Sequence, residues 1–302
     1  MPYTKRTDLA VEARELWAES APKTTKLSGV KAEDLKCHGY DVTRIQILDR
    51  EGERALDKPQ GTYVTVELSA LARREEDAFA RGVSAIREQL LPLLGMVRDD
   101  SVLVVGLGNR AITPDAVGPS TAKHTLATRH LVEHVPEHFG HFRRVTVVQT
   151  GVLGTTGMES AEMVKALVAQ FRPNRIIAVD ALASRKLTRI CRTVQICDTG
   201  IAPGSGVGNA RAKLDRETLG VPVIAVGVPT VVDAGTLVSD LLEESGRDMV
   251  PPEQWGPYGG GMIVTPKEID TQVADISKLI AYALNCTLHD GLTIEDVDML
   301  TS

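Results

Sequence analysis

Short, mostly apolar runs recur along the middle of the chain and are separated by stretches with helical periodicity. The runs lie at residues 102–105, 145–149, 175–180 and 223–228. Runs of this length and composition are typical of strands buried on both faces of a sheet. The stretches near 115–132 and 158–171 have the spacing of amphipathic helices. The repeated order of strand, loop and helix predicts right-handed crossovers and a mainly parallel sheet.

The N-terminal third has a different pattern. Residues 42–48 and 63–68 alternate apolar and polar side chains, which predicts two strands with one solvated face, paired antiparallel. A short helical pattern spans about 9–19, and a longer amphipathic one spans 73–96. We therefore expect a strand pair to add antiparallel strands to the parallel sheet.

The C-terminal half is richer in loops. Its expected elements are a strand at 194–197, a glycine-rich loop at 201–209, a helix at 234–244, an irregular segment at 245–261, and a helix from a capping box at 265–268 to about 284. Irregular segments as long as 245–261 tend to be functional or disordered.

Composition excludes several classes of function. The chain has 302 residues, of which 43% are hydrophobic, and a net charge of −6 without a strong basic cluster, so it has no nucleic-acid footprint. It has neither a secretory signal nor a run of about 18 apolar residues, so we expect no membrane span and an intracellular protein. Its four widely spaced cysteines favour reduced thiols over a disulfide framework or a zinc site.

The stretch from Ser101 to Pro119 holds the first candidate for chemistry. Two glycines follow its apolar run, and the next residues predict a helix start with Thr113 as N-cap and Pro114 at the first helical position. Asp115 would then sit in the first helical turn, at the carboxyl end of a buried strand. Open α/β sheets keep their ligands at that edge. The hypothesis is that Asp115 does chemistry.

A second carboxylate is expected at the same edge. Asp180 closes the third buried run, so the sheet would bring it near Asp115. Two such carboxylates share a proton, and one can then accept a proton from water while the other protonates the carbonyl oxygen. The glycine-rich loops after the first two strands offer candidate donors to a developing oxyanion or to substrate, at Asn109, Gly151, Thr155 and Gly157.

Other interpretations of these residues stay open. The segment Gly106-Leu-Gly-Asn is an incomplete dinucleotide fingerprint, and one alternative is therefore a nucleotide-binding or non-enzymatic module. An aspartate early in a helix ordinarily only complements the helix dipole. His130 and His134 have the spacing of a metal pair, yet no His-Glu-x-x-His pattern, which favours a solvated helix end.

Several long motifs follow one another along nearly the whole chain, at residues 6–13, 105–119, 128–131, 151–159, 179–185, 205–209, 227–233 and 264–270. In sequence and in order, these motifs resemble the spore germination protease family of endospore-forming Firmicutes. The resemblance implies an endopeptidase that degrades small acid-soluble spore proteins in the spore core during germination. It also implies a homotetramer, a fold similar to hydrogenase maturation endopeptidases (a three-layer α/β/α sandwich), and catalysis by two aspartates, which fall on Asp115 and Asp180.

The resemblance also gives the N-terminus a role. Members of that family are zymogens that trim themselves, and their substrates are cut after an acidic residue in a sequence similar to Thr7-Asp-Leu-Ala-Val-Glu12. We therefore expect self-cleavage between Asp8 and Leu9, which divides the chain into a propeptide, 1–8, and a single α/β protease domain, 9–302. The other interpretation of Thr7 is an ordinary helix N-cap.

The favoured hypothesis is an aspartate-dependent endopeptidase without cofactor or metal. The alternative is a metal-binding maturation endopeptidase of the hydrogenase-protease type, in which strand-end carboxylates and a histidine hold the ion.

Overall fold

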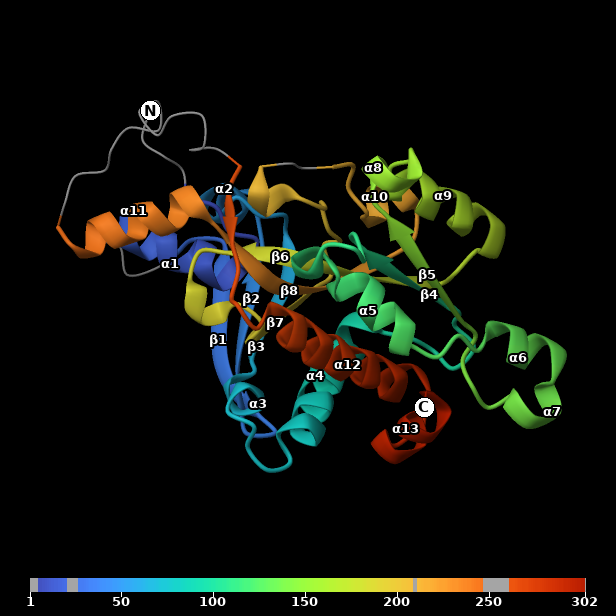
Figure 1. Ribbon diagram of the computed structural model, residues 1–302. Helices are drawn as coiled ribbons and strands as arrows, with labels where there is room; N and C mark the ends of the chain where they lie inside the picture. Colours follow the sequence, from blue (N-terminus) through green and yellow to red (C-terminus); the bar gives the residue numbers. More distant parts are fainter. Residues whose placement is uncertain (1–4, 21–26, 209–210, 247–260, 302) are drawn as a thin grey trace.

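One mixed sheet runs through the computed structural model, which describes residues 5–20, 27–208, 211–246 and 261–301 (Figure 1). In these ranges the sheet has nine strands, in the order β1-β2-β3-β7-β8-β6-β4-β5, with β9 beside β8. The strands are β1 (Val30–Cys37), β2 (Tyr40–Ile47), β3 (Gly61–Glu67), β4 (Val102–Leu107), β5 (Val145–Gly151), β6 (Arg175–Ser184), β7 (Thr193–Cys197), β8 (Val223–Asp233) and β9 (Ile263–Val264).

The parallel half of the sheet consists of β5, β4, β6 and β8. In its centre Val104 lies between Val147 on one side and Ile177 on the other. Every residue of β4 and of β8 is buried, because helices cover both faces of these strands. The four apolar runs are therefore the parallel strands that the sequence predicts. The expected burial is wrong for β5, because this strand lies at the edge of the sheet and only Val145 and Thr150 in it are buried.

The other half is antiparallel and runs β8-β7-β3-β2-β1. The predicted pairing of β2 and β3 is confirmed, with Ile45 opposite Tyr63. Strand β1 is not predicted by the pattern of apolar and polar residues. It is a largely exposed edge strand rich in Lys, Glu and Asp, which is how edge strands avoid further pairing, and this composition hides the alternation of a buried strand. The fold is α/β as expected, on a mixed sheet.

Helices form a layer on each face of the sheet (Figure 1). They are α1 (Ala10–Ser20), α2 (Arg50–Leu56), α3 (Ser69–Ala72), α4 (Ala78–Leu94), α5 (Val117–His124), α6 (Arg129–His134), α7 (Pro136–Phe139), α8 (Leu153–Thr156), α9 (Ser160–Phe171), α10 (Arg216–Leu219), α11 (Ala234–Glu244), α12 (Ile269–Leu288) and α13 (Ile294–Thr301), with short 3₁₀ turns η1 (Thr113–Asp115), η2 (Leu187–Arg189) and η3 (Ser205–Val207).

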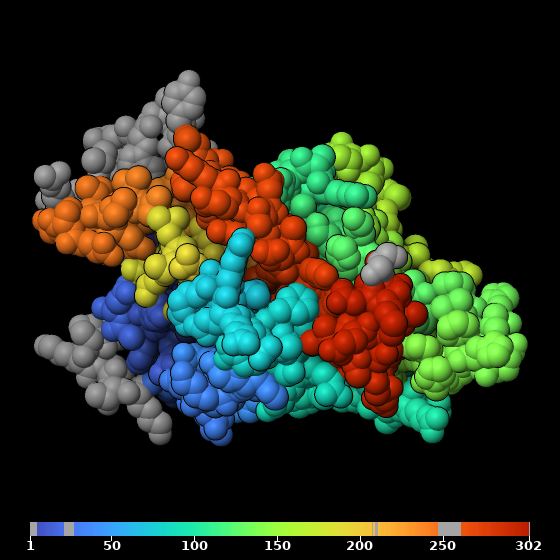
Figure 2. Space-filling view, turned by 60° about the horizontal axis from the view of Figure 1, so that its bottom comes forward, coloured from blue at the N-terminus to red at the C-terminus, as the bar shows by residue number. Residues whose placement is uncertain are grey.

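The two helical layers enclose separate apolar cores. On one face α4, α5 and α12 pack over the sheet, with Ile86 and Leu279 in one cluster with Val104 and Val226. On the other face Leu9 of the N-terminal segment packs with the antiparallel half, while α9 and α10 cover the parallel half. Figure 2 shows α12 and α13 in red between the cyan residues of α3 and α4 and the green residues of α6 and α7. The C-terminal helices thus fill the middle of that face.

The helix expected over 115–132 is in fact interrupted. The chain leaves α5 at Thr125, which is extended, and its hydroxyl donates back to the Thr121 carbonyl. The next backbone N–H, of Leu126, donates to Asn285 of α12 at 2.9 Å. A tertiary hydrogen bond therefore ends the helix where the local sequence would continue it. At the start of this region, the residue that precedes the 3₁₀ turn η1 is Ile112. The prediction of Thr113 as N-cap is therefore wrong.

Several expectations concern the rest of the chain. All four cysteines are buried free thiols. No helix among the described residues is long and apolar enough to cross a membrane. Most of the irregular segment predicted at 245–261, and residues 1–4 of the predicted propeptide, lie outside the described residues.

Candidate active site

A cavity of about 410 Å³ opens where β4 and β5 end, beside residues 180–183 of β6. Asp115 and Asp180 both line it, although they lie on different elements and 65 positions apart in the sequence. Asp8 of the N-terminal segment lines the same cavity. The structure therefore brings together the two candidate carboxylates and the residue before the expected cleavage point. The prediction that Asp180 ends its strand is wrong, because β6 continues beside β8 as far as Ser184.

Asp180 is a buried carboxyl group in β6. Only 4% of the residue is exposed, and its Oδ1 accepts one hydrogen bond, from the Ala181 N–H at 2.9 Å. Burial raises its pKa well above the usual range, and the negative charges of Asp115 and Asp8 raise this pKa further. Asp180 is thus the carboxyl of this cavity that most strongly retains a proton.

Asp115 lies at the end of η1 and is only half-buried. Burial raises its pKa, while the Asn109 backbone N–H, which donates to Oδ2 at 2.8 Å, opposes that rise. Asp115 therefore ionises more readily than Asp180. The arrangement can hold one protonated and one ionised carboxyl side by side, which is the pairing that general acid–base hydrolysis requires.

The loop between β4 and η1 is shaped around Asp115. Gly108 has φ +106°, and a Cβ there would lie 2.2 Å from the Asp115 carbonyl oxygen and 2.9 Å from its Oδ1. On the other side, the Thr230 hydroxyl of β8 donates to the Pro114 carbonyl at 2.6 Å. These two contacts fix the carboxylate relative to both β4 and β8.

Two further glycines let α5 lie directly on the sheet. A Cβ on Gly118 would lie 2.2 Å from the Leu107 carbonyl oxygen and 2.4 Å from that of Val179, and a Cβ on Gly106 would lie 2.4 Å from the Gly118 carbonyl oxygen. Gly106 and Gly118 are therefore sites of close backbone packing. The close packing of Gly106, together with the fit of Gly108 against Asp115, explains both glycines of the incomplete dinucleotide fingerprint without involving a phosphate.

Only two of the four candidate donors line the cavity. They are Gly151, at the end of β5, and Asn109, after β4, whereas Thr155 and Gly157 do not line it. The Thr155 hydroxyl donates to the Val152 carbonyl at 3.0 Å, and Gly157 ends α8 with φ +72°. Because the Asn109 N–H already donates to Asp115, its backbone is not a vacant donor for substrate.

The N-terminal segment lies along the end of β6. The Asp8 N–H donates to the Ala183 carbonyl at 2.9 Å, and the Ala183 N–H donates to Asp8 Oδ2 at 2.8 Å. Asp8 Oδ1 accepts a hydrogen bond from the Ser205 hydroxyl at 2.7 Å. Gln195 of β7 bridges the expected cleavage point, since it donates to the Asp8 carbonyl at 3.1 Å and accepts from the Ala10 N–H at 2.7 Å.

The residues after Asp8 are anchored in the protein. Leu9 is fully buried in the core of the antiparallel half, and α1 begins at Ala10. The Thr7 hydroxyl accepts the Leu9 N–H at 3.0 Å and donates to Glu12. Thr7 therefore forms the hydrogen bonds of a helix start even though it also belongs to the expected cleavage motif.

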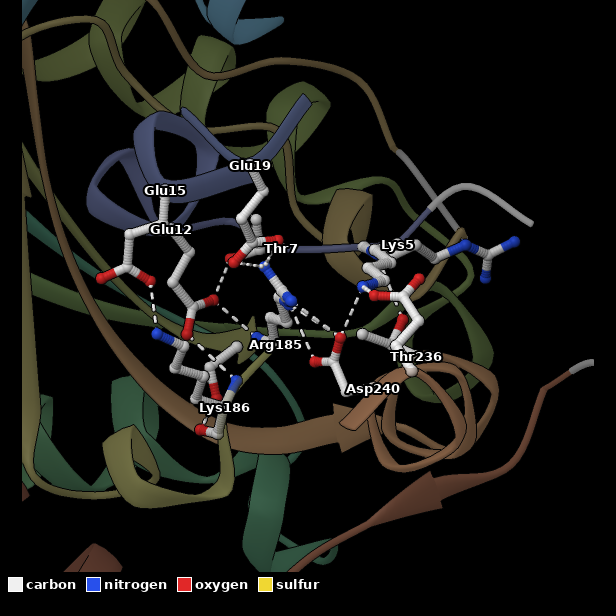
Figure 3. A network of polar contacts seen from close by, with 12 residues as sticks. Lys5, Thr7, Glu12, Glu15, Glu19, Arg185, Lys186, Thr236 and Asp240 are labelled. Carbon is white, nitrogen blue, oxygen red and sulfur yellow. Dashed lines mark hydrogen bonds and ion pairs between the residues drawn. The ribbon is translucent and has the colours of Figure 1, made fainter. Parts of the chain in front are cut away.

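A network of charged groups holds this segment against β6 and α11 (Figure 3). Lys5 pairs with Asp240 at 2.7 Å, and Asp240 also pairs with Arg185 at 2.8 Å. Arg185 reaches Glu19 of α1 at 2.8 Å. The fully buried Glu12 accepts from the backbone N–H groups of the two residues that follow β6, although burial raises the pKa of its carboxyl.

Few groups in the structure have the composition of a metal site. Among the described residues, the only three His, Cys, Asp or Glu side chains whose ligand atoms all lie within 4.8 Å of one another are Cys37, His38 and Glu88. None of the three lines the cavity. His130 and His134 lie on α6, where the His134 ring bonds the His130 carbonyl, as expected of a helix end.

Comparison with known proteins shows which family the chain belongs to. The profile of a family described as Germination protease matches residues 10–254. The chain belongs to the germination protease family. A germination protease of Caldanaerobacter subterraneus is 42% identical to it, over 98% of this chain and 97% of that protein, and one of Clostridium tetani is 39% identical over 97% and 98%.

Two further matches are more distant. A germination protease of Halalkalibacterium halodurans is 36% identical, over 99% of this chain and 97% of that protein. Among solved structures, a NiFe hydrogenase maturation protease from Thermococcus kodakarensis aligns with 19% identity and a TM-score of 0.35, over 65% of this chain and 98% of that one. Family membership confirms the resemblance carried by the motifs and the expected class of activity, a protease.

Proposed function

We propose that this protease is an endopeptidase of spore germination in which Asp115 and Asp180 activate water against a peptide carbonyl. The observation that carries the proposal is that these two carboxyl groups line one cavity, where Asp180 is buried and the charge of Asp115 raises its pKa. Such a pair holds one proton between two sites, which suits hydrolysis without a covalent intermediate.

The higher pKa of Asp180 supports a role as acid for Asp180 and as base for Asp115. Ionised Asp115 takes a proton from water, whose oxygen attacks the carbonyl carbon, while protonated Asp180 donates to the carbonyl oxygen. In the second half of the reaction, the tetrahedral intermediate returns to Asp180 the proton that Asp180 gave to the carbonyl oxygen. The nitrogen of the breaking bond takes the proton held by Asp115 and departs as an amine. Both carboxyls are then in their starting states.

The substrates follow from the family. The relatives are named germination proteases, and the motifs resemble the enzymes that degrade small acid-soluble spore proteins. We extend that substrate class to this chain, together with action in the spore core and a homotetrameric assembly. The net charge of −6 gives no reason to add direct binding of nucleic acid.

The first substrate would be the chain itself. Asp8 lines the cavity with the two carboxyls, and its carbonyl and side chain are both hydrogen-bonded there. Cleavage of the Asp8–Leu9 bond would release residues 1–8 as a propeptide and leave the domain from Leu9 onward.

The test is N-terminal mass analysis of the wild type, Asp115→Asn and Asp180→Asn under maturing conditions, with digestion of a small acid-soluble spore protein as a second readout. Each variant keeps the side-chain volume, so both activities should fall by about 10²- to 10⁴-fold. Asp99→Asn, at an exposed site, is the matched control. Loss of the first eight residues in all four chains would show that the pair does not process the chain.

The same preparation tests the metal-binding alternative. Among the described residues, no three carboxylate or histidine side chains around the cavity have ligand atoms that all lie within 4.8 Å of one another. We expect chelators to leave the rate of the wild type unchanged. Strong inhibition by a chelator, with a stoichiometric metal in the purified protein, would replace the metal-free mechanism by the alternative.

A further inference from the structure

A small niche for a carboxylate lies beside the two catalytic candidates. It is formed where the chain after Asp180 meets the turn η3, and the Asp8 side chain fills it. The Ser205 hydroxyl donates to one oxygen at 2.7 Å, and the Ala183 N–H donates to the other at 2.8 Å. Both oxygens of one carboxylate are therefore met by a donor.

The niche is also closely fitted in shape. A Cβ on Gly206 would lie 2.1 Å from Asp8 Oδ2 and 2.7 Å from the Ala183 Cβ. Only glycine at 206 leaves room for the carboxylate at this point. The turn and the strand end thus form a site whose size and donors both match an acidic side chain.

The chemistry of the niche favours an acid over its amide. The Ala183 backbone N–H can only donate, so it needs an oxygen opposite it. A carboxylate supplies oxygens to both donors with full charge, and hydrogen bonds to a charged acceptor are about twice as strong as neutral ones. An amide would have to turn its NH₂ toward Ser205 and would lose that charge.

The position of the niche relates it to the reaction. Ala183 follows Asp180 by three residues on β6, and the Asp8 carboxylate is close enough to raise the pKa of Asp180. Asp8 pairs with Ala183 through its backbone N–H as well as its side chain. A peptide bound along β6 in the same way would place its acidic side chain here, in the cavity that the carboxyl pair lines.

We propose that Ser205, the Ala183 N–H and Gly206 form the subsite that selects an acidic side chain immediately before the scissile bond, and that Asp8 occupies this subsite until the chain cleaves itself. This assignment rests on the proposed function, since it requires that the Asp8–Leu9 bond is cut. Release of residues 1–8 would empty the niche for the acidic residues of other proteins.

The experiment uses wild-type chain after self-processing and peptides with the sequence of residues 5–16. One peptide keeps Asp8, one carries Glu and one carries Asn at that position. We expect kcat/KM for the Asp and Glu peptides to exceed that for the Asn peptide by about tenfold or more, which is the worth of a hydrogen bond to a charged group. Equal rates for all three peptides would overturn the subsite while leaving the protease itself established.

Ser205→Ala removes one donor from the niche without removing buried volume. It should lower kcat/KM for the Asp peptide about tenfold and leave the Asn peptide within about twofold of wild type. Its own maturation should slow to a similar extent, so it is processed by a longer incubation. Ser84→Ala, on helix α4, is the matched control and should leave kcat/KM for both peptides unchanged.

Gly206→Ala is the second variant, because its methyl group would occupy the niche. The Gly206→Ala enzyme should cut the Asp and Asn peptides with equal kcat/KM. It should cut a peptide with Ala at the position of Asp8 with the kcat/KM of the wild type. A Ser205→Ala enzyme that keeps the wild-type preference, or that never matures although the wild type does, would overturn the assignment and leave these contacts as structural anchors. If the wild type cuts no peptide and does not process itself, the proposed function fails first.

Discussion

At the scale of single residues, the site depends on unequal burial of two like groups. Asp180 is almost fully enclosed and accepts one backbone hydrogen bond, whereas Asp115 is half-buried and accepts one from a loop N–H. Desolvation penalises the charged form of each, and it does so more strongly at Asp180. Two chemically identical side chains thereby acquire the different protonation states that an acid and a base need.

The raised pKa of Asp180 makes a prediction about stability. In the unfolded chain this carboxyl has its ordinary pKa, so the folded protein binds the proton more tightly. This tighter proton binding stabilises the folded state fully at pH values below the ordinary pKa. The stabilisation is lost as pH rises through the raised pKa of the folded state. Asp180→Asn cannot ionise and should melt at a progressively higher temperature than wild type as pH rises from about 4 to about 8.

Calorimetry across that range measures the difference. Each unit by which the two pKa values differ corresponds to about 1.4 kcal/mol of free energy of unfolding. The exposed variant Asp99→Asn should show no such trend. A constant difference between Asp180→Asn and wild type at every pH would mean that Asp180 titrates alike in the folded and unfolded chains.

At the scale of elements, β4, η1 and α5 act as one unit that delivers Asp115. The unit works because α5 lies against the sheet with backbone touching backbone at Gly118, and the short turn η1 is then confined between α5 and β8. Any movement of α5 away from the sheet must carry Asp115 with it.

Gly118→Ala tests this dependence. The added Cβ would meet the backbone of both β4 and β6 at 2.2–2.5 Å, and backbone atoms cannot rotate away as a side chain can. We expect overpacking to cost about 1–3 kcal/mol of unfolding free energy. Activity should fall by a larger factor than the fraction of folded protein does. Gly154→Ala, where a Cβ meets nothing within 4 Å, is the matched control for stability. Wild-type turnover in a folded Gly118→Ala chain would show that α5 does not position Asp115.

The same unit shows what sequence reasoning can and cannot reach. The buried strands follow from apolar runs, and family motifs together with strand-end placement single out Asp115 and Asp180 as catalytic candidates. The break after α5 depends on Asn285, and the contacts of Asp8 depend on Gln195 and Ser205, which folding brings from distant parts of the chain. Nothing in the local sequence around those three residues marks them for these roles.

At the scale of the whole molecule, the N-terminal segment joins the two halves of the sheet. Its helix α1 and Leu9 pack over the antiparallel half, while residues 5–8 continue to β6 and α11 at the end of the parallel half. Asp240 lies at the junction, because it pairs both with Lys5, which would leave on self-cleavage, and with Arg185, which would stay. The segment that carries Asp8 into the cavity is therefore also held by the ion pairs of Lys5, three residues before Asp8.

The last prediction follows from Lys5. Its side chain is only 10% exposed between Asp240 and Glu243, so Lys5→Met keeps the stem and removes two partly shielded ion pairs. In an Asp115→Asn background, where the chain should stay uncut, this change is expected to cost about 1 kcal/mol and to lower the melting temperature. In the otherwise wild-type chain it should slow self-cleavage several-fold, because fewer chains hold the segment in place.

Lys36→Met is the matched control, since it breaks an ion pair with Asp41 in which both side chains are largely exposed and which contributes little. The mature protein provides a second control. Once residues 1–8 are gone, the wild type and the Lys5→Met variant have the same sequence from Leu9 onward, so their melting temperatures and peptide-cleaving rates must coincide. A destabilising effect of Lys5→Met that persists in the matured chain would show that the first eight residues had not left, and self-cleavage at Asp8 would have to be abandoned.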